Sequence, residues 1–395
     1  MNSSKHWRAT GVALALGLLI LVFSQGGHST TKTVTVLGGG EVWLYPENGG
    51  HGIVLAALDV GELPRSAKLS LSFNTDTLRI RYDNLSFADG VFQLGFMGTG
   101  EAVFSGLLPD YYRLGKLDET RGFNAHYVML GGYFKLNLPK RQSLTLEYGA
   151  RKWFFSEGKK TADAFVLPEQ AWVFEPRLRY TFWRLGGGKG GRQRLFRRAS
   201  GIAFGVEGGV DLRNTHQRWG AFDAGAFETP DTRNNPKKLA LMGYQWLQWG
   251  WQFHSRVRVQ FKEAAALGSG MDDLNRYRIG GMTPYVIPIS GAQWAAFLSE
   301  NLVSAQTSIH FLIFGETEIG MVADGVYFDD EWRTGRSSAG FQMGVGAFYD
   351  MAFGPNQLDV RAGWSPTMDW QSDAGQFSVF VSYGRNWSFG QSEIP

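Results

Sequence analysis

Cysteine is absent from the 395 residues of this chain. The absence excludes disulfides, thiolate metal sites, a nucleophilic thiol and a lipid-modified N-terminal cysteine. An excess of one charge is also lacking, because 39 Lys and Arg nearly balance 36 Asp and Glu and leave a formal net charge of +3. The basic residues are scattered along the chain, so nothing indicates nucleic-acid binding.

Long hydrophobic runs are scarce. The apolar run from Gly11 to Phe23 has thirteen residues, fewer than the roughly 20 that a membrane-spanning helix needs. Lys5 and Arg8 precede it and the segment SQGGHS follows it, which is the arrangement of a secretory signal peptide rather than of a membrane anchor. We therefore predict that residues 1–29 are a signal peptide cleaved between Ser24 and Ser29.

Glycine and aromatic residues are abundant. The chain has 52 Gly and 14% aromatic residues, with a mean hydropathy of -0.19 that is too polar for a bundle of apolar helices. A closed membrane sheet uses both types, because glycine eases the bends of a barrel wall and aromatic rings lie at the lipid–water interfaces.

Strict alternation of apolar and polar residues runs through the chain from about residue 66, which is the period of β-strands. The last segment shows it best. One face carries Phe377, Val379, Val381, Tyr383, Trp387 and Phe389, and the other carries Ser378, Ser382, Gly384, Asn386 and Ser388. Phe380 and Arg385 are exceptions, and the Arg385 side chain is expected to extend toward lipid headgroups.

The polar faces carry charges, as in the segment where Arg177 and Arg179 alternate with Leu178 and Tyr180. Period two alone fits either a secreted sandwich or a barrel with lipid outside and charges inside. The signal peptide, the aromatic content and the strand count favour an all-β, transmembrane antiparallel β-barrel of about 14 strands, with 12–16 possible. The strands are predicted near 67–74, 77–86, 90–105, 122–138, 142–155, 170–184, 200–213, 238–250, 253–263, 302–314, 317–327, 338–350, 356–366 and 375–389.

The predicted barrel covers residues 67–389 and is flanked by two segments outside the alternation. Residues 30–66 are expected to form a periplasmic tail or a partial plug, and residues 390–395 a short tail. An even strand number places both termini on the periplasmic side, with short turns there and longer loops outside. The longest outer loop, 264–301, is rich in aromatics, Pro and Gly, and loops of this length are usually functional.

Before its last six residues, GQSEIP, the chain reads SYGRNWSF. This segment resembles the C-terminal insertion signal that barrel-assembly machinery recognises in outer-membrane proteins, through Ser382, Gly384, Trp387 and Phe389. A final strand with a free edge can add to another sheet by backbone hydrogen bonds. The resemblance implies that the barrel-assembly machinery is a partner during biogenesis.

Residues 276–327 contain YRIGG with Arg278 and MVADGVYF with Asp324. They resemble the C-terminal barrel of the BamA-type superfamily, also called the bacterial surface antigen family. The resemblance implies a loop folded into the lumen and latched there by an Arg278–Asp324 contact. It also implies a barrel-only member without the periplasmic POTRA domains, because residues 30–66 are too few for one.

Enzymatic signals are poor. The predicted mature chain offers His51, His126, His216, His254 and His310, and none stands in a nucleophile elbow or a metal-ligand spacing. We therefore predict no catalytic residue, no metal site and no cofactor.

The functional expectation is an integral protein of the bacterial outer membrane that acts in assembly, insertion or translocation. The alternative is a passive porin or specific channel, and an outer-membrane enzyme is a third possibility. Outer-membrane lipid and lipopolysaccharide are the expected surroundings.

Overall fold

The computed structural model describes residues 32–45, 49–74, 77–101, 112–113, 116–117, 123–158, 161–186, 200–221, 235–282, 286–292, 297–314, 317–329, 340–367 and 375–389. The predicted signal peptide, 1–29, and the tail, 390–395, lie outside these residues. Within them, no helix is long and apolar enough to cross a membrane.

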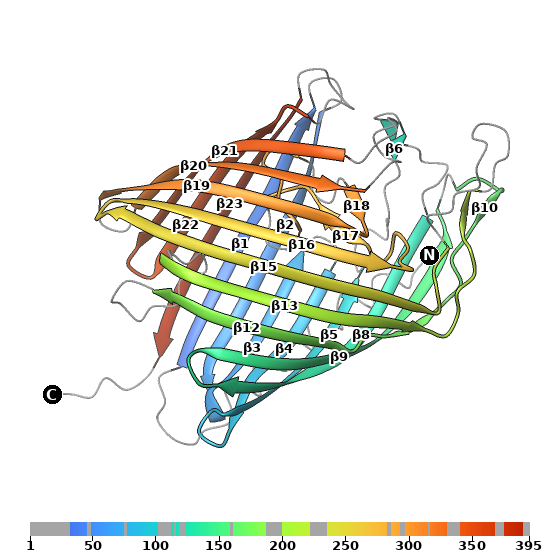
Figure 1. The fold of residues 1–395 in the computed structure, drawn as a ribbon, viewed down its shortest axis with the longest axis horizontal. Coiled ribbons are helices and arrows are strands. Elements are labelled where there is room, and N and C mark those ends of the chain that lie inside the picture. The colour runs from blue at the N-terminus through green and yellow to red at the C-terminus, as the bar shows by residue number, and fades with distance from the viewer. Residues whose placement is uncertain are drawn as a thin grey trace.

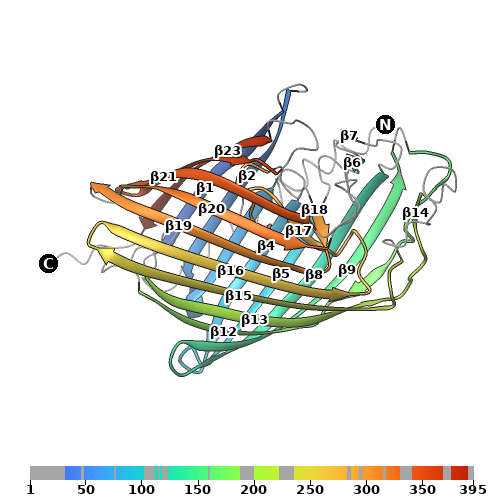
Figure 2. The same cartoon turned by 45° about the horizontal axis from the view of Figure 1, so that its top comes forward.

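A single antiparallel sheet of long strands closes on itself and forms a barrel (Figures 1 and 2). The wall strands are β1 (Lys32–Tyr45), β2 (Gly49–Leu63), β3 (Ala67–Asn74), β4 (Thr77–Phe87), β5 (Phe92–Glu101), β8 (Phe123–Leu138), β9 (Gln142–Glu157), β11 (Trp172–Phe174), β12 (Arg177–Gly186), β13 (Ser200–Arg213), β15 (Leu239–His254), β16 (Val257–Ser269), β19 (Leu302–Phe314), β20 (Thr317–Phe328), β21 (Gly340–Phe353), β22 (Asn356–Ser365) and β23 (Gln376–Phe389).

These segments make a barrel of 16 strands, because β11 and β12 both lie between β9 and β13 and share one position in the wall. Each strand pairs with the next along the chain, and β1 pairs with β23 to close the ring. The predicted all-β transmembrane barrel is confirmed, with a strand count at the upper end of the predicted range.

The two additional strands come from the segment 30–66, for which the prediction of a tail or plug is wrong. β1 and β2 pair along thirteen residues and form part of the wall. The error has a physical cause, because Gly38, Gly39 and Gly40 interrupt the alternation of side chains in β1 without interrupting its backbone pairing.

The two faces of the wall differ as the alternation predicts. In β23, Phe377, Val381 and Tyr383 are exposed on the outside, whereas Ser378 and Ser382 are buried on the inside. The same distribution holds around the barrel, where large apolar side chains point outward and charged ones point into the lumen. The molecule is therefore built for a surrounding of lipid.

The strand connections fall at two ends. Lys32 pairs with Phe389 at what we call the terminal end, and short connections such as 139–141, 255–256 and 354–355 lie there. Longer connections, such as 158–171, 270–301 and 366–375, lie at the opposite loop end. Short elements within the connections are η1 (Pro64–Ser66), β6 (Tyr112–Arg113), β7 (Lys116–Leu117), β10 (Phe165–Val166), β14 (Gly220–Ala221), β17 (Tyr277–Ile279) and β18 (Phe297–Ser299).

Candidate functional site: the lumenal loop and the cavity beside it

The connection between β16 and β19, residues 270–301, folds into the barrel and is called the lumenal loop. Its strands β17 and β18 pair with each other, and they lie inside the ring of wall strands (Figure 1). Its apolar side chains are packed against inward-facing residues of the wall. The cluster consists of Ala264, Ala266, Ile279, Ile287, Ile289, Ala292, Phe297, Leu302, Val326 and Phe328. Burial of each large aliphatic or aromatic side chain contributes roughly 1.5–3 kcal/mol.

The first half of the loop is held by a buried ion pair. Both terminal nitrogens of Arg213 donate to the Asp272 carboxylate, at 2.8 and 2.9 Å, and the Trp219 indole donates to the same group at 3.1 Å. The Asp272 side chain is fully buried. Removing one partner of such a pair leaves an uncompensated buried charge, so this contact fixes where the loop enters the lumen.

Tyr277 fixes the next turn of the loop. Its hydroxyl donates to the backbone oxygen of Gly243 on β15 at 2.9 Å, and its ring stacks on Tyr244. Burial raises the pKa of the Tyr277 phenol to about 12. The hydroxyl therefore stays protonated and keeps donating this hydrogen bond at physiological pH.

A second anchor joins the loop to β20. The Ser290 backbone N–H and hydroxyl both donate to the Asp324 carboxylate, at 2.9 and 2.6 Å. Asp324 is buried and points inward, as the alternation of β20 predicts. Hydrogen bonds to an ionised group are the stronger kind.

The predicted latch residues are not brought together. Asp324 makes no ion pair with any residue that the structure describes, and its loop partner is Ser290. Arg278 lies in β17, where it pairs with Leu298 and lines a separate cavity of about 360 Å³ together with Arg177 and Glu175. Asp324 does hold the lumenal loop, but through a residue that sequence reasoning did not single out.

A third anchor ties the loop to the first strand. The Met282 N–H donates to both carboxylate oxygens of Glu41, each at 3.0 Å. Glu41 is fully buried, and the Met282 side chain packs with Trp43 of β1 and Phe380 of β23. The lumenal loop therefore reaches the junction where the barrel closes.

Glycines let the loop backbone lie directly on the wall. A Cβ on Gly344 of β21 would stand 2.2 Å from the Ser290 oxygen, and one on Gly363 of β22 would stand 2.4 Å from the Gly291 nitrogen. Gly291 itself has φ +87° and has the backbone of β22 against it. Any side chain at these positions would displace the loop.

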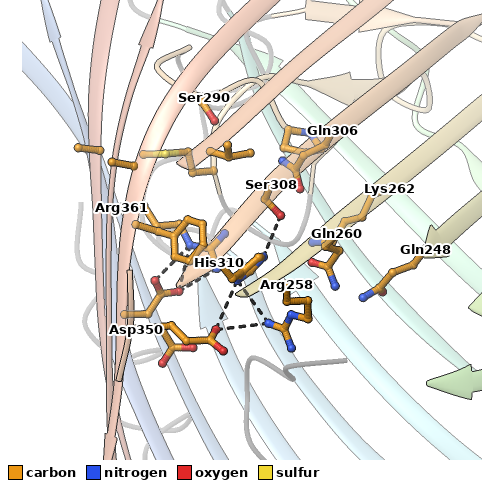
Figure 3. Close-up of a pocket in the computed structure, with 18 of the residues that line it drawn as sticks. Gln248, Arg258, Gln260, Lys262, Ser290, Gln306, Ser308, His310, Asp350 and Arg361 are labelled. Atoms are coloured by element: carbon orange, nitrogen blue, oxygen red, sulfur yellow. Dashed lines mark hydrogen bonds and ion pairs between the residues drawn. The ribbon is translucent and has the colours of Figure 1, made fainter. Parts of the chain in front are cut away.

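Beside the loop, toward the terminal end, the lumen holds a polar cavity of about 410 Å³ (Figure 3). Met282, Pro288 and Ser290 of the loop line one side of it. Its other lining residues lie on the wall. They are Trp183, Leu185, Gln248, Arg258, Gln260, Lys262, Gln306, Ser308, His310, Glu318, Val322, Ala347, Phe348, Asp350, Asp359, Arg361 and Ala362.

Two charge groups occupy the end of the cavity near the short turns. Arg258 pairs with Glu318 at 3.3 Å, and His310 lies between Ser308 and Glu318. Arg361 pairs with Asp359 at 2.9 Å. His310 is thus a hydrogen-bonded wall residue. Among the described residues, no group of three or more His, Cys, Asp and Glu could hold a metal ion.

The predicted insertion-signal residues all lie in β23. Ser382 and Gly384 are buried on the inner face, and Phe389 is the last residue of the strand. Arg385 is exposed on the outer face, and its guanidinium lies 5.2 Å from the Trp387 ring centroid. Because β23 pairs with both β22 and β1, the signal segment is part of a closed wall.

Comparison with solved structures identifies the fold. BamA from Haemophilus ducreyi lacking POTRA domains 1–3 superposes with a TM-score of 0.59 at 12% identity, over 91% of this chain and 71% of that one. The chain has the fold of a BamA-type barrel. The predicted resemblance to this superfamily is confirmed at the level of structure, and the fold is that of outer-membrane β-barrels.

Other solved BamA-type barrels resemble this chain as well. CdiB from Acinetobacter baumannii gives a TM-score of 0.54 at 12% identity, and CdiB from Escherichia coli gives 0.53 at 13%. The chain covers 60% and 64% of those two proteins, less than two thirds of their length. Searches with family models and among curated protein sequences gave no match.

Proposed function

We propose that this chain is a gated outer-membrane barrel that acts in assembly, insertion or translocation, with the lumenal loop as its plug. The observation that carries the proposal is the triple anchoring of the loop, through Asp272, Ser290 and Met282, to three separate parts of the wall. A passive porin needs an unobstructed lumen, whereas a gated transporter needs a closed resting state. The BamA and CdiB folds support the same reading.

The junction between β1 and β23 favours translocation through the lumen over lateral release into the membrane. The two strands pair without interruption from Lys32 opposite Phe389 to Leu44 opposite Phe377, which is thirteen residue pairs. Opening this seam would leave a row of backbone donors and acceptors unpaired in lipid, at several kcal/mol for each group. The groups freed by displacing the loop lie in the lumen instead, where water rather than lipid can solvate them.

The proposed orientation places the terminal end in the periplasm and the loop end outside, because short turns are typical of the periplasmic side. The outer face would contact outer-membrane lipid and lipopolysaccharide, and barrel-assembly machinery would recognise β23 before the ring closes. We propose a non-enzymatic role.

The test is single-channel conductance in planar bilayers. The intact chain is compared with a variant in which residues 271–300 are replaced by a short Gly-Ser linker. We expect a quiet intact protein and a large steady pore after the replacement. A variant with residues 330–339 replaced by the same linker is the control, and it should remain quiet.

Heat-modifiable migration on gels shows that each variant has folded before its conductance is read. A large steady pore in the intact protein would contradict the plug and indicate a porin. A loop-replaced barrel that folds but stays closed would also contradict it.

A further inference from the structure

One row of inward-facing residues crosses six neighbouring wall strands of the cavity. The register places Trp183 opposite Ala203, Ala203 opposite Gln248, and Gln248 opposite Lys262. The row continues through Gln306 to Asp324, the anchor of the lumenal loop. Because neighbouring strands are about 4.8 Å apart, Trp183 and Lys262 are separated by roughly 14 Å along the wall.

Lys262 differs from the other cations of this cavity. Arg258 and Arg361 each have a carboxylate partner, whereas Lys262 has no ion pair or hydrogen bond to any residue that the structure describes. Its side chain is exposed to the lumen. Gln248 and Gln260 beside it are likewise without a hydrogen-bond partner in the described chain, and Figure 3 shows all three side chains with no contact drawn between them.

The chemistry of this group suits an anion. An ammonium offers three donors, and two amides offer further donors that can be turned toward the same acceptor oxygens. Phosphate and carboxylate are the groups that such donors bind. Trp183, at the other end of this row, is 37% exposed, so a ring or sugar extending from the anion along the row could lie against its face.

We infer that the cavity is a binding site for a phosphate- or carboxylate-bearing substrate, with Lys262 as the charged ligand and Gln248 and Gln260 beside it. Met282, Pro288 and Ser290 line the same cavity, so the bound group lies against the plug. The inference deepens the proposed function by naming the substrate chemistry. It rests on the proposed function only for the assumption that the substrate enters the cavity from the terminal end of the barrel.

The experiment is titration calorimetry of the full folded chain in detergent micelles, with inorganic pyrophosphate, glucose 6-phosphate and glucose as probes. We expect binding of both phosphates and not of glucose. Lys262→Gln should lower the affinity for both phosphates by about tenfold or more, and Lys262→Arg should retain most of that affinity. Trp183→Leu should weaken glucose 6-phosphate more than pyrophosphate.

Lys135→Gln is the matched control. Lys135 alternates with the outward-facing Phe134 on β8 and so faces the lumen, but it does not line this cavity. Equal losses in the Lys262 and Lys135 variants would show general electrostatic attraction and overturn the site, as would unchanged affinity in Lys262→Gln or no binding by the intact chain. None of these results alters the conductance of the loop-replaced barrel, which tests the plug separately.

Discussion

Three buried carboxylates hold the lumenal loop. Glu41 and Asp324 lie on the wall and accept hydrogen bonds from the loop. Asp272 lies on the loop and accepts hydrogen bonds from Arg213 and Trp219. Glu41 and Asp272 are fully buried, and Asp324 is 6% exposed. A buried carboxylate is costly unless it is paired or hydrogen-bonded. The loop therefore stabilises the wall as much as the wall holds the loop, because loss of the loop would leave Glu41 and Asp324 without these partners.

The Ser290–Asp324 contact can be tested by a double-mutant cycle with Ser290→Ala and Asp324→Asn. The readout is the ratio of open to closed time in bilayer recordings. We expect both single variants to raise this ratio, with a coupling of about 0.5–3 kcal/mol between them. The control cycle pairs Arg278→Gln with Asp324→Asn and should be additive, since no ion pair joins these residues. Coupling in the second cycle alone would contradict the Ser290–Asp324 anchor and support the predicted Arg278–Asp324 contact instead.

Asp324 was predictable as a lumenal residue because strand alternation sets its face. Its partner was not, because alternation says nothing about the path of a loop across the lumen. The contact between Glu41 and Met282 was not predictable either, since they are 241 residues apart. Glu41 also lies in the segment 30–66, for which the sequence predicts a periplasmic tail or a partial plug. A carboxylate on the inner face of a glycine-rich strand was the available signal.

At the scale of elements, the loop and the wall fit together through backbone contacts that only glycine permits. The alternation of apolar and polar residues predicts fourteen of the wall strands, because each of these strands has one apolar face toward lipid. β1 and β2 do not follow from it. Gly38, Gly39 and Gly40 of β1 have no side chains, and the run IVLAAL of β2, residues 53–58, is apolar on both faces. β1 forms a local hairpin with β2, but its other partner, β23, is distant in sequence.

Gly291→Ala should dislodge the loop from β22. A Cβ there would stand 2.4 Å from the Ser365 nitrogen, and the positive φ adds backbone strain. We expect frequent openings in bilayers and faster protease cleavage within the loop. Gly354→Ala is the matched control, because Gly354 also has a positive φ, of +57°, but a Cβ there meets nothing within 4 Å. Similar openings in both variants would show that strain alone, rather than loop contact, explains the effect.

At the scale of the whole molecule, closure of the ring bears on the route of the proposed transport. The chain has no cysteine, so no native thiol competes with an introduced pair of cysteines. Leu44 and Phe377 face each other across the seam and are both on the outer surface, 47% and 40% exposed.

Leu44→Cys combined with Phe377→Cys should form a disulfide on oxidation and change migration on non-reducing gels. If transport uses the lumen, the loop-replaced barrel should conduct equally well with the seam locked. Leu44→Cys with Tyr327→Cys, on the distant strand β20, controls for oxidation and should not cross-link within a monomer. Loss of transport only in the locked seam would favour lateral release.

The Glu41–Met282 contact also bears on the order in which the molecule is completed. Most wall contacts join adjacent strands and close short segments, whereas this one closes a segment of 241 residues. The entropy of closing a chain segment rises with its length, and distant contacts form late for that reason. Met282 also packs against Phe380 of the final strand, so its site is complete only when that strand has joined β1. The Arg213–Asp272 and Ser290–Asp324 contacts close segments of only 59 and 34 residues, so by the same reasoning they form early and hold the loop in the lumen, and the Glu41 contact is added last. A newly assembled barrel would then be plugged as soon as its seam forms, which limits membrane leakage during biogenesis.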